Sequence, residues 1–101
     1  SLNGYEKGQD TISVFMKTVG NNIRKERINK GLSLAALGED IGLDKGNLYR
    51  IEQGKNFTLL TLTKIGAFLE VNPARLFNNC NEIRIQDAEN YIKKNKQNRK
   101  T

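Results

Sequence analysis

The sequence contains no histidine and no tryptophan, and only one cysteine and one proline among its 101 residues. Without histidine, catalysis that uses an imidazole as base or acid is excluded. The single Cys80 cannot form a disulfide within the chain, and no cluster of Cys and His offers metal ligands. We therefore expect a protein of a reducing compartment that holds no metal or cofactor and is not an enzyme.

The chain also lacks any long hydrophobic run. No stretch approaches the roughly 20 apolar residues of a membrane span, and no apolar signal-peptide core follows a basic start. A length of 101 residues fits one domain with flexible ends and leaves no room for a second domain that binds a small-molecule ligand. These features predict a single-domain cytoplasmic protein that does not contact membranes.

Basic residues exceed acidic ones, 17 against 11, which gives a net charge of +6 and a pI near 9.6. The excess is uneven along the chain. Residues 17–57 and 78–101 each carry a net charge of +3, whereas residues 1–16 carry −1. This distribution favours a polyanionic partner such as a nucleic acid.

Apolar residues recur every three or four positions near the N-terminus, on one face of a predicted helix. They are Ile12, Phe15, Met16, Val19 and Ile23. This helix should run through Arg27 and end near Lys30, because Gly31 can adopt the left-handed conformation that closes a helix. Residues 11–16 either continue this helix or form an extended arm, since their β-branched side chains also suit a strand. Residues 1–10 are predicted to be a mobile arm.

Capping residues predict four more helices. The expected N-caps are Ser33, Asp44, Thr58 and Asn72. The helix after Asp44 should cover residues 45–53, and the helix after Asn72 should be short and cover residues 73–77. Because the connecting turns are only two to five residues long, the predicted fold class is all-α. We expect a compact five-helix bundle over residues 19–77, with extensions at residues 1–18 and 78–101.

The C-terminal extension allows two predictions. Ile85, Ala88 and Ile92 would share one stripe of a sixth helix, whereas Ile83 and Ile85 alternate like a short strand. Residues 93–101 are polar and basic, and we expect them to fray.

The segment from Leu32 to Gly54 has the spacing of a helix-turn-helix. Two short helices that cross steeply need a tiny residue where they approach and a residue tolerant of positive φ in the turn. Gly38 and Gly42 satisfy these needs. Apolar residues can hold both helices to the core at Leu37, Ile41, Leu43, Leu48 and Ile51.

Residues 19–77 resemble the Cro/phage-repressor type helix-turn-helix family, also called the Xre family. The resemblance rests on four motifs taken together and in order. They are Ile23-Arg24-x-x-Arg27, Gly31-Leu32-Ser33, Arg50-Ile51-Glu52-x-Gly54-Lys55 and Leu69-x-Val71-Asn72-Pro73-x-x-Leu76-Phe77. The resemblance implies a lambda-repressor-like domain that binds double-stranded DNA as a homodimer on a two-fold symmetric operator. We expect a transcriptional regulator, and more narrowly a repressor.

The resemblance also implies roles for individual residues. The third helix would enter the major groove with Lys45, Gly46 and Arg50 facing base edges and with Asn47 and Tyr49 nearby. Lys and Arg suit guanine, and Asn suits adenine or a phosphate. Phosphates would be bound by the amides behind the Ser33 cap and by Lys55 and Asn56. Arg27 and Glu52 would form a structural ion pair between the first and third helices.

The chain departs from the family pattern at several apolar positions. Leu34 stands where Gln is common, and we expect it to pack against a neighbouring element. Phe57, Leu60 and Phe68 could form a patch with the apolar residues of the N-terminal extension. Either the two extensions fold over the fourth helix, or two chains bury the patch between them. We favour a dimer through the fourth and fifth helices with the extensions contributing. An alternative function is a protein-binding module, such as an antitoxin, that uses the domain with a partner protein.

Overall fold

The computed structural model describes residues 8–100, with side chains described for residues 8–96. Its elements in chain order are α1 (Thr11–Asn29), α2 (Leu34–Ile41), α3 (Lys45–Glu52), α4 (Leu59–Leu69), the 3₁₀ helix η1 (Pro73–Phe77) and α5 (Ile85–Lys100). No strand occurs within the described residues. The fold is therefore the all-α bundle that the sequence predicted, and the C-terminal extension adds a helix rather than a strand. Most of the predicted N-terminal arm, residues 1–7, lies outside the described residues.

Residues 11–16 continue the first helix. The side chain of Asp10 accepts a hydrogen bond from the Ile12 amide at 3.0 Å and so caps α1. One turn later, the Phe15 ring packs against the core with its centroid 6.0 Å from that of Phe77. A cap and an apolar contact together outweigh the strand preference of the β-branched residues in this turn.

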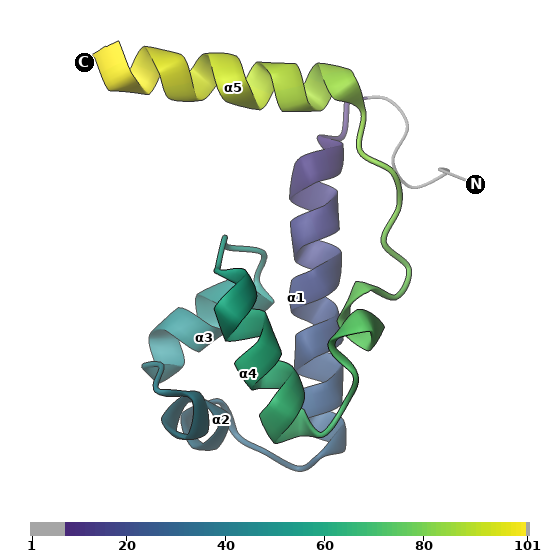
Figure 1. Cartoon of the computed structure of the whole chain (residues 1–101), viewed down its shortest axis with the longest axis vertical. Coiled ribbons are helices and arrows are strands. Elements are labelled where there is room, and N and C mark those ends of the chain that lie inside the picture. Colours follow the sequence, from purple (N-terminus) through teal and green to yellow (C-terminus); the bar gives the residue numbers. More distant parts are fainter. Residues whose placement is uncertain (1–7, 101) are drawn as a thin grey trace.

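Short helices surround one apolar core. The fully or nearly fully buried residues come from all five elements of the bundle and are Val19, Ile23, Leu37, Ile41, Leu48, Ile51, Leu62, Ile65, Leu69 and Leu76. Leu34 and Phe57 pack against this core from its edge, as predicted for Leu34. Figure 1 shows α1 along one side of the bundle, with α2, α3 and α4 grouped on the other side.

Three of the four predicted caps are made by side chains. Ser33, Thr58 and Asn72 accept hydrogen bonds from amides in the first turns of α2, α4 and η1. Asp44 occupies the N-cap position of α3, but its side chain makes no capping hydrogen bond, which corrects the prediction.

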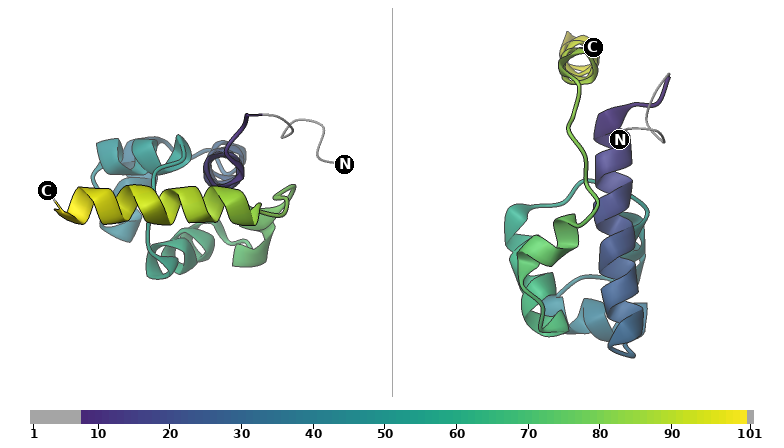
Figure 2. Two further views of the ribbon diagram at one scale, coloured as in Figure 1. Left: turned by 90° about the horizontal axis from the view of Figure 1, so that it is seen from above. Right: turned by 90° about the vertical axis from the view of Figure 1, so that its right-hand side faces the viewer.

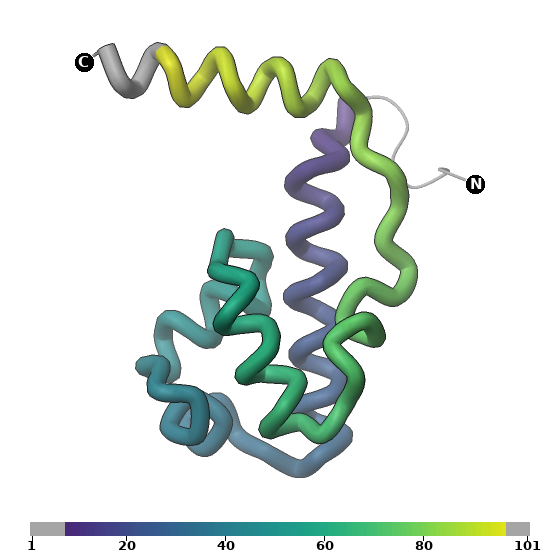
Figure 3. Tube along the Cα trace, in the orientation of Figure 1, coloured from purple at the N-terminus to yellow at the C-terminus, as the bar shows by residue number. Residues whose placement is uncertain are grey.

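Helix α5 leaves the bundle instead of covering it. It packs against the N-terminal end of α1 and runs almost perpendicular to it, well apart from α4 (Figures 1 and 3). The radius of gyration is 15.0 Å, above the roughly 13 Å of a compact chain of about 100 residues. The backbone is helical as far as Lys100, although the polar and basic sequence of residues 93–101 predicted fraying. The C-terminal extension therefore does not fold over the fourth helix.

Candidate nucleic-acid interface

Helices α2 and α3 form the predicted helix-turn-helix. Figure 1 views α2 nearly along its axis and α3 from the side, so the two helices cross steeply. A Cβ at Gly38 would lie 2.5 Å from the carbonyl oxygen of Leu43, so only glycine fits at this crossing. Gly42 ends α2 with a φ of 75°, in the left-handed region. The turn that positions α3 thus depends on both glycines, as expected from the sequence.

One face of α3 is buried and the other is exposed. Leu48, Ile51 and Glu52 are 0%, 6% and 4% exposed. The exposed positions are Lys45, Asn47, Tyr49 and Arg50, with Gly46 half-buried between them. A short helix that is held by three inward residues and presents polar groups outward can enter a groove of DNA and keep its core packing.

A buried ion pair holds the C-terminal end of α3 against α1. Arg27 donates to both carboxylate oxygens of Glu52, from Nε at 2.7 Å and from Nη2 at 2.9 Å. Its Nη1 donates to the carbonyl oxygen of Leu32 at 2.8 Å, just before α2. The hydrogen bonds to Glu52 raise the pKa of Arg27 above its ordinary value, although burial opposes the shift. This buried pair connects α1, the α1–α2 turn and α3, which is the structural role expected for it.

Gly20 contributes to the same junction, although it was not among the residues predicted from the sequence. A Cβ at this position would lie 2.5 Å from the carbonyl oxygens of both Ile51 and Glu52. Glycine therefore lets α1 approach the end of α3 closely. A glycine within a predicted helix is the sequence signal for such an approach.

The structure brings four of the predicted DNA-binding residues together. Nη1 of Arg50 donates to Oδ1 of Asn47 at 2.7 Å, so one side chain orients the other. Both line a shallow surface hollow with Lys55 and Asn56, from the loop between α3 and α4. The loop residues are exposed. Amide and cationic side chains thus converge on one patch beside α3.

Tyr49 lies apart from that patch. It lines a second hollow, between α3 and α1, together with Lys17, Asn21 and Arg24. The α1 residues of this hollow were not predicted as site residues. Their spacing along one side of a helix, three and four residues apart, is the signal that could have identified them. Lys17 and Arg24 add positive charge beside the exposed face of α3.

Ser33 acts first as a helix cap. Its Oγ accepts a hydrogen bond from the Ala36 amide at 3.0 Å. The first amides of a helix have no intrahelical acceptor and carry the positive end of the helix dipole. The N-terminal end of α2 can therefore bind an anion such as a phosphate.

Other kinds of site find no support in the part of the chain that the structure describes. This part contains no group of three or more His, Cys, Asp or Glu side chains that could hold a metal ion. None of its helices is both long enough and apolar enough to cross a bilayer. Cys80 is half-buried, and burial raises the pKa of its thiol above the ordinary value, which disfavours the reactive thiolate. The chemistry on the surface is that of hydrogen-bond donors and positive charge around α3.

The fold and this surface define a helix-turn-helix DNA-binding domain, and comparisons with known proteins agree. A helix-turn-helix family model matches residues 23–76. The crystal structure of the restriction-modification controller protein C.AhdI from Aeromonas hydrophila is similar, with 32% identity and a TM-score of 0.59 over 61% of this chain and 96% of that one. The hypothetical transcription factor NHTF from Neisseria is similar at 25% identity and a TM-score of 0.59, over 77% of this chain and 83% of that one. A search of curated proteins found no significant match.

Because the family match covers more than half of the chain, the chain belongs to the Cro/C1-type helix-turn-helix family. It is a DNA-binding transcriptional regulator. The expectation drawn from the sequence about family, fold and general function is confirmed. The family consists of regulators rather than enzymes.

Proposed function

We propose that the protein is a repressor that binds a two-fold symmetric operator as a homodimer and reads it with α3. The observation that carries this proposal is the division of α3 into a buried face and an exposed polar face. Lys45 and Arg50 would donate to guanine O6 and N7 in the major groove. Asn47, which is hydrogen-bonded to Arg50, would contact an adjacent base or phosphate. Since the target is DNA, we place the protein in the cytoplasm and assign it no catalytic role.

Phosphate contacts would supply most of the affinity. The candidates are Lys55 and Asn56 in the exposed loop, and the amides behind the Ser33 cap at the start of α2. If about 6 phosphates are neutralised in the complex, the slope of log affinity against log salt should be near −5. Gly46 has no side chain to read a base, so it would let the α3 backbone approach the DNA closely.

Selection of bound sequences from a random duplex library tests whether α3 contacts the bases of the operator. The wild-type protein should enrich duplexes that contain a palindromic sequence. Lys45→Ala should relax preference at one or two base pairs by about 1–3 kcal/mol. Lys55→Ala should weaken all sites nearly alike and make the salt slope less steep by about 0.9 for each protomer bound, because each protomer loses one phosphate contact.

Lys25 offers a matched control for these two variants, because it is exposed on α1 and lines neither hollow beside α3. Lys25→Ala should leave both base preference and salt slope close to wild type. If no palindromic sequence is enriched from the library, the protein does not bind a two-fold symmetric operator specifically. Equal effects of the Lys45 and Lys25 variants would remove Lys45 from the base-reading surface.

We infer the dimer from the exposed apolar residues on the outer face of α4, which we propose as its interface. Leu59, Leu60 and Phe68 are 74%, 64% and 46% exposed there, which leaves an apolar surface without cover. Two recognition helices must lie about 34 Å apart to reach successive major grooves, and an isologous dimer provides this spacing. The similarity to a restriction-modification controller protein, which aligns over 96% of its own length, supports a regulatory role for this domain.

Sedimentation of a Leu60→Asp variant tests the dimer. A carboxylate at this exposed position should disfavour a buried apolar interface and shift the protein toward monomer. Thr63→Asp places a carboxylate one turn further along α4, at another exposed position. A shift of this variant toward monomer in sedimentation would show that the interface reaches Thr63. A wild-type protein that stays monomeric at high micromolar concentration, with or without operator DNA, would contradict the dimer.

A further inference from the structure

Helix α5 is held in a fixed direction by hydrogen bonds at its first turn. Oδ2 of Asp87 accepts from the Thr11 amide at 2.9 Å and from Oγ1 of Thr11 at 2.6 Å. The same Thr11 hydroxyl accepts from the Arg84 amide at 2.9 Å, and Nε of Arg84 donates to Asp87 at 3.0 Å. The N-terminal ends of α1 and α5 thus cap each other. We call these hydrogen bonds among Thr11, Arg84 and Asp87 the α1–α5 corner.

The corner directs α5 toward the side of the molecule that carries the helix-turn-helix. Figures 1 and 2 show α5 running from the N-terminal end of α1 across the bundle, so that its C-terminal end lies on the side of α2 and α3. The helix has 16 residues and is about 24 Å long. Within the described residues it packs on α1 near the corner, so its outer half extends away from α1.

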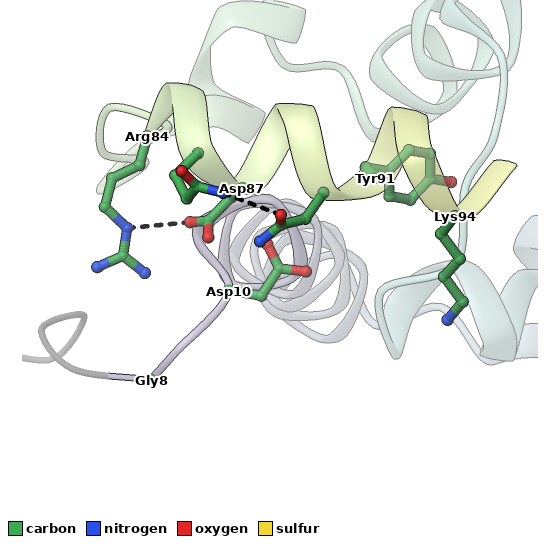
Figure 4. A pocket seen from close by; sticks show the side chains of 8 residues that line it. Gly8, Asp10, Arg84, Asp87, Tyr91 and Lys94 are labelled. Atoms are coloured by element: carbon green, nitrogen blue, oxygen red, sulfur yellow. Dashed lines mark hydrogen bonds and ion pairs between the residues drawn. The ribbon is translucent and has the colours of Figure 1, made fainter. Parts of the chain in front are cut away.

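The outer half of α5 is strongly cationic. Lys93, Lys94 and Lys96 are exposed, and no acidic residue follows Glu89. Figure 4 shows Arg84 and Asp87 at the start of the helix, with Tyr91 and Lys94 further along it. The helix dipole accounts for cations only in the last turn, whereas Lys93 lies about two turns before the end. Glu89 lies one turn before Lys93 and can offset its charge, whereas Lys94 and Lys96 have no acidic residue within one turn on the same helix.

The apolar residues of α5 do not extend into this half. Ile85, Tyr91 and Ile92 are exposed in the first half of the helix, and no apolar residue follows Ile92. An apolar groove on a second copy of the chain would therefore fit the first half of α5 and not the second. Charge complementarity assigns the second half to a polyanion.

We propose that the segment of α5 around Lys93, Lys94 and Lys96 is a second DNA-binding element, which contacts the phosphate backbone beside the half-site read by α3. This proposal rests on the operator reading proposed above for α3. It extends the interface beyond the residues 23–76 that define the family. Because phosphates carry no base identity, α5 adds affinity and leaves base preference to α3.

The test compares three variants of the full chain on the selected operator, by fluorescence anisotropy at several salt concentrations. Lys93→Gln/Lys94→Gln should make the slope of log affinity against log salt less steep by about 0.9 for each phosphate that it no longer neutralises. Its affinity at 0.1 M salt should fall by roughly tenfold for each such phosphate. Lys93→Arg/Lys94→Arg keeps the charge and should retain the wild-type slope.

The matched control is Lys25→Gln/Lys30→Gln, which removes the same charge at the opposite end of α1. It should leave the slope unchanged, and the exposed ion pair of Lys30 with Glu70 contributes little to stability. A Lys93→Gln/Lys94→Gln slope equal to that of wild type would overturn the proposal. So would a shift of this variant toward monomer in sedimentation without DNA, because α5 would then serve a protein interface.

The experiments distinguish failure of the proposed base contacts of α3 from failure of the proposed phosphate contacts of α5. A weakened base preference in Lys45→Ala reports on α3, and a weakened salt dependence in the α5 variant reports on α5. If Lys45→Ala keeps full base preference, α3 is misassigned whatever the α5 slopes show. If the α5 variant changes base preference, its lysines contact bases, and the backbone role is wrong.

Discussion

The bundle and α5 are held in place by different forces. Inside the bundle, Leu37 and Leu48 are fully buried, and helix positions follow from apolar packing around them. Helix α5 is placed by polar contacts at the α1–α5 corner, with its own Ile85 78% exposed. In the bundle the position of each helix rests on many apolar contacts, whereas the position of α5 rests on a few hydrogen bonds among three residues.

The two kinds of placement suit two different tasks of a DNA-binding protein, contact with bases and contact with phosphates. In the proposed complex the bundle would hold α3 rigidly, because base contacts need accurate geometry. An arm that contacts only phosphates needs direction and charge more than accuracy, since the backbone is uniform along the duplex. Four experiments test this difference, in order of decreasing expected effect.

Removal of one partner of the buried ion pair should affect the bundle most. Arg27→Met leaves the Glu52 carboxylate, which is 4% exposed, without its partner and should cost about 3–5 kcal/mol of unfolding free energy. Arg27→Met/Glu52→Leu removes both charges and should cost far less. Urea unfolding of both variants and of Glu52→Leu gives the double-mutant cycle. Additive costs would show that the two side chains act independently.

A methyl group at Gly20 should destabilise the bundle by a smaller amount. The new Cβ would meet two backbone carbonyl oxygens at 2.5 Å, and such overpacking typically costs about 1–3 kcal/mol. Asn21→Ala, at the next and exposed position of α1, should change stability by less than about 0.5 kcal/mol. Urea unfolding measures both. Equal stability of the two variants would show that α1 can shift away from α3 without cost.

Removal of the corner carboxylate should free α5 and leave the bundle intact. Asp87→Ala removes the acceptor of the Thr11 amide and hydroxyl. Amides in α5 should then exchange with solvent much faster, while amides of buried Ile23 and Leu48 should keep their protection. Glu89→Ala, an exposed position on the same helix, is the control. Unchanged exchange in α5 would mean that another contact holds the arm.

Acidification should weaken the α1–α5 corner, and we expect its effect on the structure to be the smallest of the four. Hydrogen bonds from the side chain and amide of Thr11, together with Arg84, hold the pKa of Asp87 below its ordinary value. A carboxylate with a lowered pKa in the folded state stabilises the corner fully above about pH 4. That contribution disappears as the pH falls through the folded pKa.

The Thr11 amide shift, followed by NMR during acid titration, reports this protonation. We expect a step below about pH 4 in wild type, with release of α5 from α1 at the acid end. The step should be absent in Asp87→Ala. A wild-type midpoint above the ordinary carboxyl value would contradict the corner geometry.

Local features predicted much of the fold. Ser33, Thr58 and Asn72 cap their helices within two or three residues, and the side chain and amide concerned are always close in sequence. The role of Gly38 followed from the helix-turn-helix spacing. Asp44 lies at the N-cap of α3 as predicted, but its side chain makes no capping hydrogen bond.

The candidate site was predicted less completely. The α3 residues followed from the family resemblance, and their exposure agrees with it. Lys17 and Arg24 join the second hollow because α1 passes beside α3, a contact that no pattern within either helix specifies. Gly20 was missed for the same reason, since its significance depends on backbone atoms more than 30 residues away.

Caps, glycines and periodicity act over a few residues, so helix ends, apolar faces and the helix-turn-helix spacing can be inferred from the order of the residues. The direction of α5 cannot be inferred in this way. Its corner joins Thr11 to Asp87 across 76 positions, and hydrogen bonds between residues so far apart form only after the bundle has brought the two ends of the chain together.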